Sequence, residues 1–414
     1  MAPERELRLL GMRLPIPVPD FWRLWLVGLI FFLGRWFDTL AMSVYVYQQT
    51  HSAFLVSLLM VLRFLPMSLF GMIIADIADR IERRSLLLCI NLSLLGVALT
   101  LALLEHAGML AVWHLMVASF LGGISTAADN PVRRLMIGEV VGGARIGAAM
   151  SIDVGASNGT RTFGPFIAGA LLAAWGIGSV FMVDAAMYAL ATFVTLFIRC
   201  RNEGHSPKDE PILRRLAEGW AICRASPKLM GTLLLTIYFN IFVYPYVSIV
   251  PVIGAGILHL DAAQIGILAS MDGLGSLLGA LLIGAVVKQA QVQRLYVACV
   301  AAGHVTIILF ALAASAYLSG AALLAVGIAT AGFSVGQNTL IFILTPEHAR
   351  ARMMGLLTVS IGVGPAGFLL FGTLADIIGP AQATIVMPLA GIATMFVTRR
   401  YWLPLFSKVT PVAG

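Results

Sequence analysis

Long apolar runs separated by short polar segments dominate the chain. Six runs lie near residues 21–46, 54–77, 86–104, 109–128, 150–174 and 177–198, and six more near 229–250, 262–287, 295–315, 319–344, 353–377 and 380–403. Each run is close to the about 20 apolar residues that an α-helix needs to cross a bilayer. The pattern predicts an all-α membrane protein with twelve transmembrane helices in two six-helix halves.

A polar stretch at 199–228 separates the two sets of predicted helices. We expect a cytoplasmic N-terminal segment (1–20), an N-terminal six-helix bundle (21–198), a cytoplasmic linker (199–228), a C-terminal six-helix bundle (229–403) and a cytoplasmic tail (404–414). Within the linker, apolar side chains recur at helical spacing between Ile212 and Cys223, with arginines opposite. This spacing predicts an amphipathic helix on the membrane surface, and its simplest role is to join the halves.

An internal repeat supports the division into halves. The spacing of Gly155, Gly164 and Pro165 recurs 200 residues later, between Gly355 and Pro365. Both sets fall in the fifth predicted helix of their half. Duplicated six-helix halves are typical of transporters whose substrate site lies at the membrane midplane between the repeats.

Composition and charge define the class of protein and its orientation. Apolar residues make up 59% of the chain and charged residues only 11%, against about 25% charged residues in soluble domains. This composition excludes a soluble fold, a secreted protein and nucleic-acid binding. Of the 27 basic residues, Arg35, Arg63 and Arg161 lie deep within predicted helices, and the other 24 lie on one side of the membrane. By the positive-inside rule, both termini and the linker are cytoplasmic.

Two segments resemble signatures of the major facilitator superfamily. ADIADRIERRSLLL at 75–88 resembles the loop between the second and third helices, with Ala75 and Glu82 in place of two glycines. GASNGTRTFGPFIAG at 155–169 is similar to the fifth-helix signature of drug/proton antiporters. The resemblance extends over nearly the whole chain and implies the major facilitator fold in a bacterial inner membrane.

Three further segments resemble one branch of that superfamily, the enterobactin exporters and macrolide efflux proteins. They are DNPVRR at 129–134, AEGWAICRASPKLMGTLLL at 217–235 and TPEHARARMMGL at 345–356, in which Ala351 replaces a glycine. These segments indicate the branch and leave the substrate open.

The resemblance implies a gating latch on the cytoplasmic side. In the family, the loop acid contacts the N-terminus of the eleventh helix, and a loop arginine pairs with an acid at the end of the fourth helix. Asp79, Arg80 and Asp129 occupy the matching positions, and Arg83 and Arg84 belong to the same turn. We therefore predict a latch that favours the outward-open state, because a carboxylate stabilises a helix N-terminus and an arginine pairs strongly with an acid.

A second motif, Gly155, Gly164, Pro165 and Gly169, predicts close helix packing in the fifth helix. Glycine removes the side chain and proline removes an internal hydrogen bond, so two helices can approach closely and bend. A seal on the outer side of one state and simple tight packing both fit this motif.

Ionisable residues inside apolar runs are the candidates for proton coupling, because a charge at the membrane midplane costs several kcal/mol and is kept for function or pairing. Asp38 is the favoured proton carrier, followed by Asp272, while Asp184 near the outer end of its helix is less favoured. Relatives often carry an acid where Arg35 stands, so a structural network of Arg35, Asp38 and Arg63 fits equally well. The full set of candidates is Asp38, Asp272, Arg35, Arg63, Asp153 and Arg161.

By analogy with the fold, the seventh and tenth helices face a central substrate cavity. Their aromatic and amide side chains could stack on or hydrogen-bond an amphipathic molecule or a cation. An interfacial aromatic belt and helix-to-helix hydrogen bonds are the alternatives. The candidates are Tyr238, Asn240, Phe242, Tyr244, Gln337 and Asn338.

The sequence predicts a secondary exporter of small organic molecules, drug-like or siderophore-like, that works by proton antiport with alternating access. Its partners would be the substrate, protons and the lipid bilayer, with a monomer sufficient for the fold and neither a cofactor nor a metal required. The chain has no Walker phosphate loop and no H-E-x-x-H or G-x-S-x-G motif, so it is not expected to be an enzyme. A facilitator or proton symporter for uptake is the alternative within transport, and a non-transporting membrane sensor or embedded enzyme is the alternative of another class.

Overall fold

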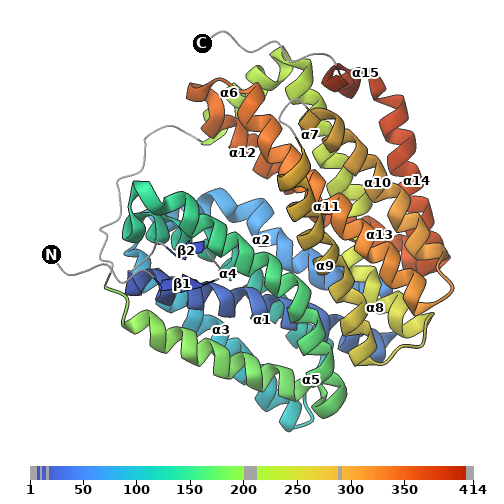
Figure 1. Cartoon of the computed structure of the whole chain (residues 1–414). Helices are drawn as coiled ribbons and strands as arrows, with labels where there is room; N and C mark the ends of the chain where they lie inside the picture. Colours follow the sequence, from blue (N-terminus) through green and yellow to red (C-terminus); the bar gives the residue numbers. More distant parts are fainter. Residues whose placement is uncertain (1–6, 10–11, 15–17, 200–211, 288–290, 407–414) are drawn as a thin grey trace.

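The computed structural model describes residues 7–9, 12–14, 18–199, 212–287 and 291–406. Helices make up nearly all of this part of the chain. The exception is a small antiparallel pair of strands, β1 (Leu7–Leu9) and β2 (Met12–Leu14), in which Leu7 is opposite Leu14. The predicted all-α membrane architecture is therefore confirmed (Figure 1).

The N-terminal part of the chain forms long helices joined by tight turns. They are α1 (Pro19–Thr50), α2 (Ala53–Arg80), α3 (Arg83–His106), α4 (Val112–Val141) and α5 (Ile146–Leu196), with a short 3-10 turn, η1 (Gly143–Arg145), before α5. The 51 residues of α5 would extend about 77 Å as one straight helix, more than twice the ~30 Å hydrocarbon core of a bilayer. Gly176 interrupts α5 with φ 75° and ψ 179°, so the chain reverses there. Glycine adopts such a positive φ without steric cost.

The C-terminal part contains more broken helices. They are α6 (Ile212–Ala225), α7 (Pro227–Tyr238), the π-helical turn η2 (Phe239–Val243), α8 (Tyr246–Gly256), α9 (Ala262–Val286), α10 (Val292–Leu312), α11 (Ala316–Leu344), η4 (Glu347–Ala349), α12 (Arg350–Ile361), α13 (Gly364–Ile378), α14 (Pro380–Val397), α15 (Arg399–Trp402) and η5 (Leu403–Phe406). The seventh predicted helix thus consists of α7, η2 and α8, and the eleventh of α12 and α13. Pro245 and Pro365 lie at these breaks, as expected for a residue that cannot donate an internal hydrogen bond.

The number of membrane spans is only partly established. Within the described residues, nine helical segments are long and apolar enough to cross a bilayer, with α5 counted once and α7 to α8 counted as one. The nine omit α2 and α4, and α4 carries Asp129, Arg133, Arg134 and Glu139 in its second half. The count of twelve spans stays a prediction.

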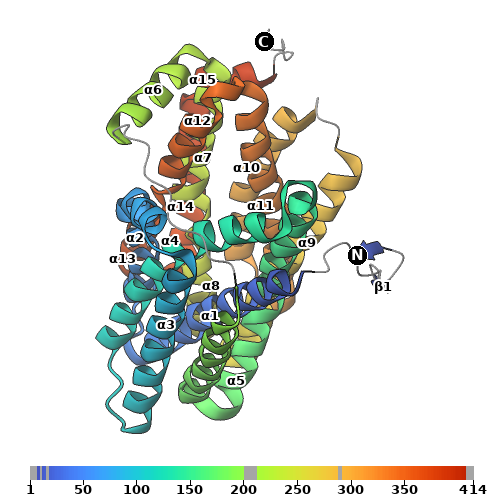
Figure 2. The same cartoon turned by 90° about the vertical axis from the view of Figure 1, so that its left-hand side faces the viewer.

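The predicted linker helix is present as α6, which packs against α12. Arg352 Nε of α12 lies 2.8 Å from a carboxylate oxygen of Glu218. Figure 2 shows α6, α12 and α15 together at one end of the molecule, and the reversal of α5 at the opposite end. Burial of Cys223, which belongs to α6, raises the pKa of its thiol to about 11, so the thiol stays protonated at neutral pH.

Helices α1 to α5 and α7 to α14 meet where α5 packs on α9, α2 on α13, and both α1 and α2 on α8. At these crossings Gly256 faces Tyr47, Gly372 faces Ser57, and Gly266 faces Gly169. All of these residues lie within about two helical turns of the chain reversals at 51–52, 176, 257–261 and 379. The two sets of helices are therefore joined close to one end.

Candidate functional site

A cavity of about 160 Å³ lies where the two sets of helices meet. Residues of α2, η2, α11, α12 and α13, and of the turns beside them, form its wall. The wall consists of aromatic, aliphatic and uncharged polar side chains, among them Phe64, Ser68, Asn240, Tyr244, Gln337 and Phe368. Such a lining suits an amphipathic organic ligand better than an ion.

The aromatic part of this wall is shared between the two sets of helices. The rings of Phe64 from α2 and Phe368 from α13 are stacked, with centroids 5.7 Å apart and planes 9° from parallel. The Tyr244 ring presents its edge to both, at 6.2 Å from each. A ligand that stacks on these rings would contact helices from both sides of the interface.

The polar part of the wall is held by a buried hydrogen-bond network. Thr236 Oγ1 lies 2.9 Å from the Tyr296 hydroxyl and 3.4 Å from Gln337 Oε1, and Asn240 donates to the Thr236 carbonyl at 2.9 Å. The π-helical turn adds one residue to α7, as shown by the 2.8 Å bond from the Tyr244 amide to the Phe239 carbonyl. Asn240 within this turn and Tyr244 directly after it both line the cavity, and π-helical turns are frequent at functional sites.

Three of the six predicted cavity residues, Asn240, Tyr244 and Gln337, line this cavity. The other three lie outside its wall. Tyr238 is buried in the hydrophobic core, Phe242 packs against Gly391 of α14, and Asn338 is exposed and donates to the Ser334 carbonyl of its own helix. Successive residues of a helix point about 100° apart, so the neighbour of a lining residue faces elsewhere.

The cavity residues that sequence reasoning missed include Phe64 and Phe368, together with further residues of α2, α11, α12 and α13. Both phenylalanines lie in long apolar runs that contain other large side chains. The apolar pattern of these two runs does not show which way any single side chain faces. Only the rotation of each helix about its axis identifies the residues that face the cavity.

Arg161 and Asp272, both predicted as proton-coupling candidates, form an ion pair that joins α5 to α9. Arg161 Nε lies 2.9 Å from Asp272 Oδ2, and Nη2 lies 3.0 Å from Oδ1 and 2.7 Å from Oδ2. The Tyr246 hydroxyl and Ser276 Oγ are both 3.4 Å from the guanidinium. Gly273 allows this geometry, because a Cβ there would meet the backbone of Arg161.

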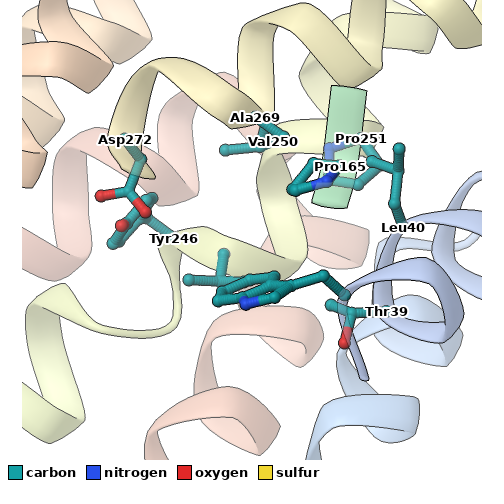
Figure 3. Close-up of a pocket in the computed structure, with 10 residues that line it drawn as sticks. Thr39, Leu40, Pro165, Tyr246, Val250, Pro251, Ala269 and Asp272 are labelled. Carbon is teal, nitrogen blue, oxygen red and sulfur yellow. The ribbon is translucent and has the colours of Figure 1, made fainter. Parts of the chain in front are cut away.

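A second, smaller cavity of about 30 Å³ lies beside this ion pair. Trp36 and Leu40 of α1, Pro165 of α5, and Tyr246 and Asp272 contribute to its wall. Figure 3 shows the Asp272 carboxyl next to the Tyr246 ring, with Pro165 and Leu40 on the far side of the cavity. The ion pair therefore borders a small, mostly apolar cavity between the two sets of helices.

The predicted cluster of Arg35, Asp38 and Arg63 is only partly present. Arg63 Nη2 lies 3.8 Å from Asp38 Oδ2. The Arg35 guanidinium instead lies over the rings of Trp36 and Phe32, 5.3 and 5.8 Å from their centroids, and pairs with no carboxylate among the described side chains. The partner that the sequence did not predict is Asp184, whose buried carboxyl faces that of Asp38.

Asp153 and Asp129, predicted as a coupling candidate and a latch residue, share one partner, Arg133. Arg133 is fully buried, its Nε lies 3.1 Å from Asp129 Oδ2, and its Nη1 contacts Asp153 Oδ1. Arg134 approaches Asp153 at 3.8 Å. These contacts join α4 to α5, so Asp153 serves packing within one set of helices in this conformation.

The remaining latch residues also bind within the N-terminal set of helices. Arg83 pairs with Glu139 of α4, and Arg84 donates to the Leu196 carbonyl of α5 at 2.6 Å. The side chains of Asp79 and Arg80 lie outside the described part of the structure. The predicted latch to the eleventh helix therefore stays a prediction.

In the packing motif predicted for the fifth helix, two glycines lie in close contact with neighbouring helices and a third faces open space. A Cβ on Gly164 would lie 2.7 Å from Trp36 Cβ, and one on Gly169 would lie 2.6 Å from the Ala262 carbonyl oxygen. The Pro165 carbonyl oxygen would lie 2.5 Å from a Cβ on Gly266. A Cβ on Gly155, in contrast, would meet no atom within 4 Å.

A carboxylate that sequence reasoning did not single out joins the two sets of helices near the reversal at 51–52. Asp376 Oδ1 at the end of α13 accepts from the Ala53 amide at 2.7 Å and the Phe54 amide at 3.1 Å, and Oδ2 accepts from the Ser52 hydroxyl at 2.7 Å. A carboxylate at a helix N-terminus binds unpaired amides and the positive end of the helix dipole. Asp376 thus caps α2 from the opposite half.

The helix arrangement and the cavity between two helix sets define a membrane transporter of the major facilitator class. Solved structures support this fold. A POT family transporter in complex with 5-aminolevulinic acid superposes with a TM-score of 0.77 at 15% identity, covering 97% of this chain and 99% of that one. An inward-facing, unoccupied bacterial homologue of the lysosomal transporter Spinster gives 0.71 at 16% identity, covering 95% and 98%.

Residues 13–412 match the transmembrane secretion effector family, and the chain belongs to that family. The enterobactin exporter EntS of Shigella flexneri is 27% identical over 91% of this chain and 90% of its own length. The staphyloferrin A transporter of Staphylococcus aureus is 21% identical over 90% and 93%. Macrolide efflux protein A of Streptococcus pyogenes is 24% identical over 59% of this chain, which spans 61% of that protein. The resemblance to the efflux branch is confirmed.

Proposed function

We propose that this chain exports small organic molecules, drug-like or siderophore-like, by proton antiport with alternating access. The observation that carries the proposal is the cavity whose aromatic wall is shared by α2 and α13. Relatives named for macrolide efflux, staphyloferrin A transport and enterobactin export support an amphipathic organic substrate. The aromatic rings of the wall would stack on the ring systems of such a molecule, and the amide side chains would bind its polar groups.

Alternating access requires contacts that hold one end closed and can be broken. The Arg161–Asp272 pair and the Asp376 cap of α2 are contacts of this kind, because both join the two sets of helices. A proton on Asp272 would remove one charge of the pair and weaken the contact, which would favour opening of this end. The latch of Asp79, Arg80 and Asp129 would hold the other end closed in the opposite state.

We further propose the membrane topology that follows from the charge distribution. In it, α5 contributes two spans that meet at Gly176, and α2 and α4 are spans as well, which gives twelve. Both termini, and the linker that contains α6, would lie in the cytoplasm of a bacterial cell. The end joined by Asp376 would then be the outer end, and the cavity would open inward.

Transport in proteoliposomes with an imposed pH gradient tests the proposal, with a macrolide and enterobactin as substrates. We expect gradient-driven movement of at least one substrate class. Gln337→Ala should lower the apparent affinity about 2- to 10-fold, the range expected for one lost hydrogen bond. Asn338→Ala is the matched control, because the adjacent Asn338 side chain is exposed and faces away from the cavity.

The same experiment separates the alternative functions. Substrate movement that is independent of the pH gradient would indicate a facilitator. Substrate that follows protons in the same direction would indicate a symporter for uptake. Absence of movement for all substrates, together with normal folding and binding, would favour a non-transporting sensor.

A further inference from the structure

A pair of carboxyls between α1 and the second half of α5, the partly exposed Asp38 and the fully buried Asp184, has no role in the cavity or in the Arg161–Asp272 pair. Asp184 has no exposed surface, and no donor among the described groups lies within hydrogen-bond distance of either of its carboxylate oxygens. The acid that faces it is Asp38, one turn beyond Gly34 on α1. Ionised carboxylates only accept hydrogen bonds, so two facing carboxyls can bond to each other only when one of them holds a proton.

A glycine of α1 leaves room for the pair. Gly34 lies one turn before Asp38, and a Cβ at this position would lie 3.2 Å from Asp184 Oδ1 and would overlap the Tyr188 hydroxyl. The missing side chain thus gives the carboxyl of Asp184 and the hydroxyl of Tyr188 room beside α1. Close approach of two acids is therefore built into the packing of these helices.

The charges that surround the pair favour one proton. Arg63 of α2, whose side chain is 7% exposed, lies 3.8 Å from Asp38 and carries one positive charge. Two ionised carboxylates beside it would leave a net negative charge in a low-dielectric region, whereas one shared proton makes the group neutral. Two further charged side chains lie farther away, Arg35 of α1 and Asp129 of α4. Arg35 interacts electrostatically with Arg63, and Asp129 with Tyr188.

We propose that Asp38 and Asp184 together hold one exchangeable proton and form the proton site of this transporter. The role in transport rests on the proposed proton antiport, but the shared proton itself does not. Loss of the proton to solvent leaves two ionised carboxylates beside Arg63, and rebinding restores the neutral group. A carboxyl pair that shares one proton is a known consequence of placing two like charges at one site.

The position of Arg63 connects this proton site to the substrate cavity. The next residue, Phe64, lines the cavity and stacks on Phe368 of α13. Opening of the α2–α13 interface would shift α2, and with it the distance from Arg63 to Asp38. A closer Arg63 stabilises two ionised carboxylates and releases the proton, whereas a more distant Arg63 favours proton uptake.

Infrared difference spectroscopy on the purified full chain tests the shared proton directly. We expect a carbonyl band of a protonated carboxyl at neutral pH, which disappears on titration to high pH. Asp184→Asn should remove this band, because Asp38 is then left with only Arg63 as a charged neighbour and ionises. Asp184→Glu should keep the band, and Asp153→Asn is the control, since Asp153 is already paired with Arg133. Arg63→Gln should strengthen the band, because both carboxyls then hold protons.

A band that is absent from the wild-type protein, or one that Asp184→Asn leaves unchanged, would overturn the shared proton regardless of any transport result. Asparagine has the shape of a protonated aspartic acid, so Asp184→Asn should fold, and Asp184→Glu covers the case in which it does not. In proteoliposomes, Asp184→Asn should lose accumulation against a substrate gradient driven by pH and keep downhill exchange. If the carbonyl band behaves as expected but transport by the wild type does not respond to a pH gradient, the proposal of proton antiport is contradicted and the shared proton is supported.

Discussion

At the scale of single residues, most buried charges in the helices are balanced by a charge on another helix. Asp272 pairs with Arg161, Asp153 with Arg133, and Asp38 with Arg63. A lone buried charge is costly, so each pair lowers that cost. The pairs differ in what they join, because only Arg161 and Asp272 connect the N-terminal and C-terminal sets of helices.

Removing one member of that pair should destabilise the protein more than removing both. Asp272→Asn leaves the Arg161 guanidinium with no ionised partner, which costs about 3–5 kcal/mol for a buried pair. The double variant Arg161→Gln with Asp272→Asn leaves no unpaired charge and should recover much of this loss. Thermal unfolding in detergent measures both. Equal stability of the wild type and Asp272→Asn would contradict a stabilising pair.

The identity of the charged residues was predictable from the sequence, but their partners were not. Asp38, Asp153, Arg161 and Asp272 stand out because charges are rare in apolar runs. Their pairing depends on which way each helix is rotated and on which helices are adjacent. Asp184 illustrates the difference, since its position near a helix end disfavoured it and only the packing of α1 against α5 reveals its carboxyl partner.

At the scale of helices, glycines determine how closely α5 and α9 approach. A Cβ on Gly266 or Gly273 would meet backbone atoms of α5, which cannot rotate away as a side chain can. Close backbone approach at small residues is a principal source of helix association in membranes. The extent of most helices was predictable from the apolar runs. The end of α4 at Val141 and the breaks in α7–η2–α8 and α12–α13 were not, because a run can stay apolar across a break and a helix can continue beyond its apolar run.

Gly273→Ala should therefore separate α5 from α9 and weaken the Arg161–Asp272 pair. The expected result is a lower unfolding temperature in detergent and slower transport. Gly155→Ala is the matched control on α5, because a Cβ there meets no atom within 4 Å and alanine favours a helix over glycine by up to about 1 kcal/mol. Equal effects of the two substitutions would argue against backbone contact as the role of Gly273.

At the scale of the whole molecule, the contacts between the halves extend from one end of the helices to about their middle. Asp376 caps α2, Phe64 stacks on Phe368, and Arg161 pairs with Asp272. The six-plus-six pattern and the charge distribution predict the orientation of the chain, whereas the conformation could not be predicted. A transporter sequence must be compatible with two arrangements of its halves, so no sequence pattern selects one of them.

Cysteine labelling in intact cells tests the proposed topology. In a variant whose four native cysteines are replaced by serine, a cysteine at Glu218 should react only after the cytoplasmic side is exposed. A cysteine at Ser315 or Asp261 should react with an impermeant maleimide from outside. Cys223 itself is a poor reporter because burial raises the pKa of its thiol to about 11. Reaction of position 218 from outside would reverse the proposed orientation.

The central claim is that substrate and protons move in opposite directions through this protein. The most direct measurement is the internal pH of proteoliposomes, followed with an enclosed pH-sensitive dye while a substrate gradient drives transport in the absence of an imposed pH gradient. We predict a proton flux opposite to the substrate flux, which Asp184→Asn abolishes while substrate exchange continues. Substrate movement with no change in internal pH, or with protons moving in the same direction, would contradict the account.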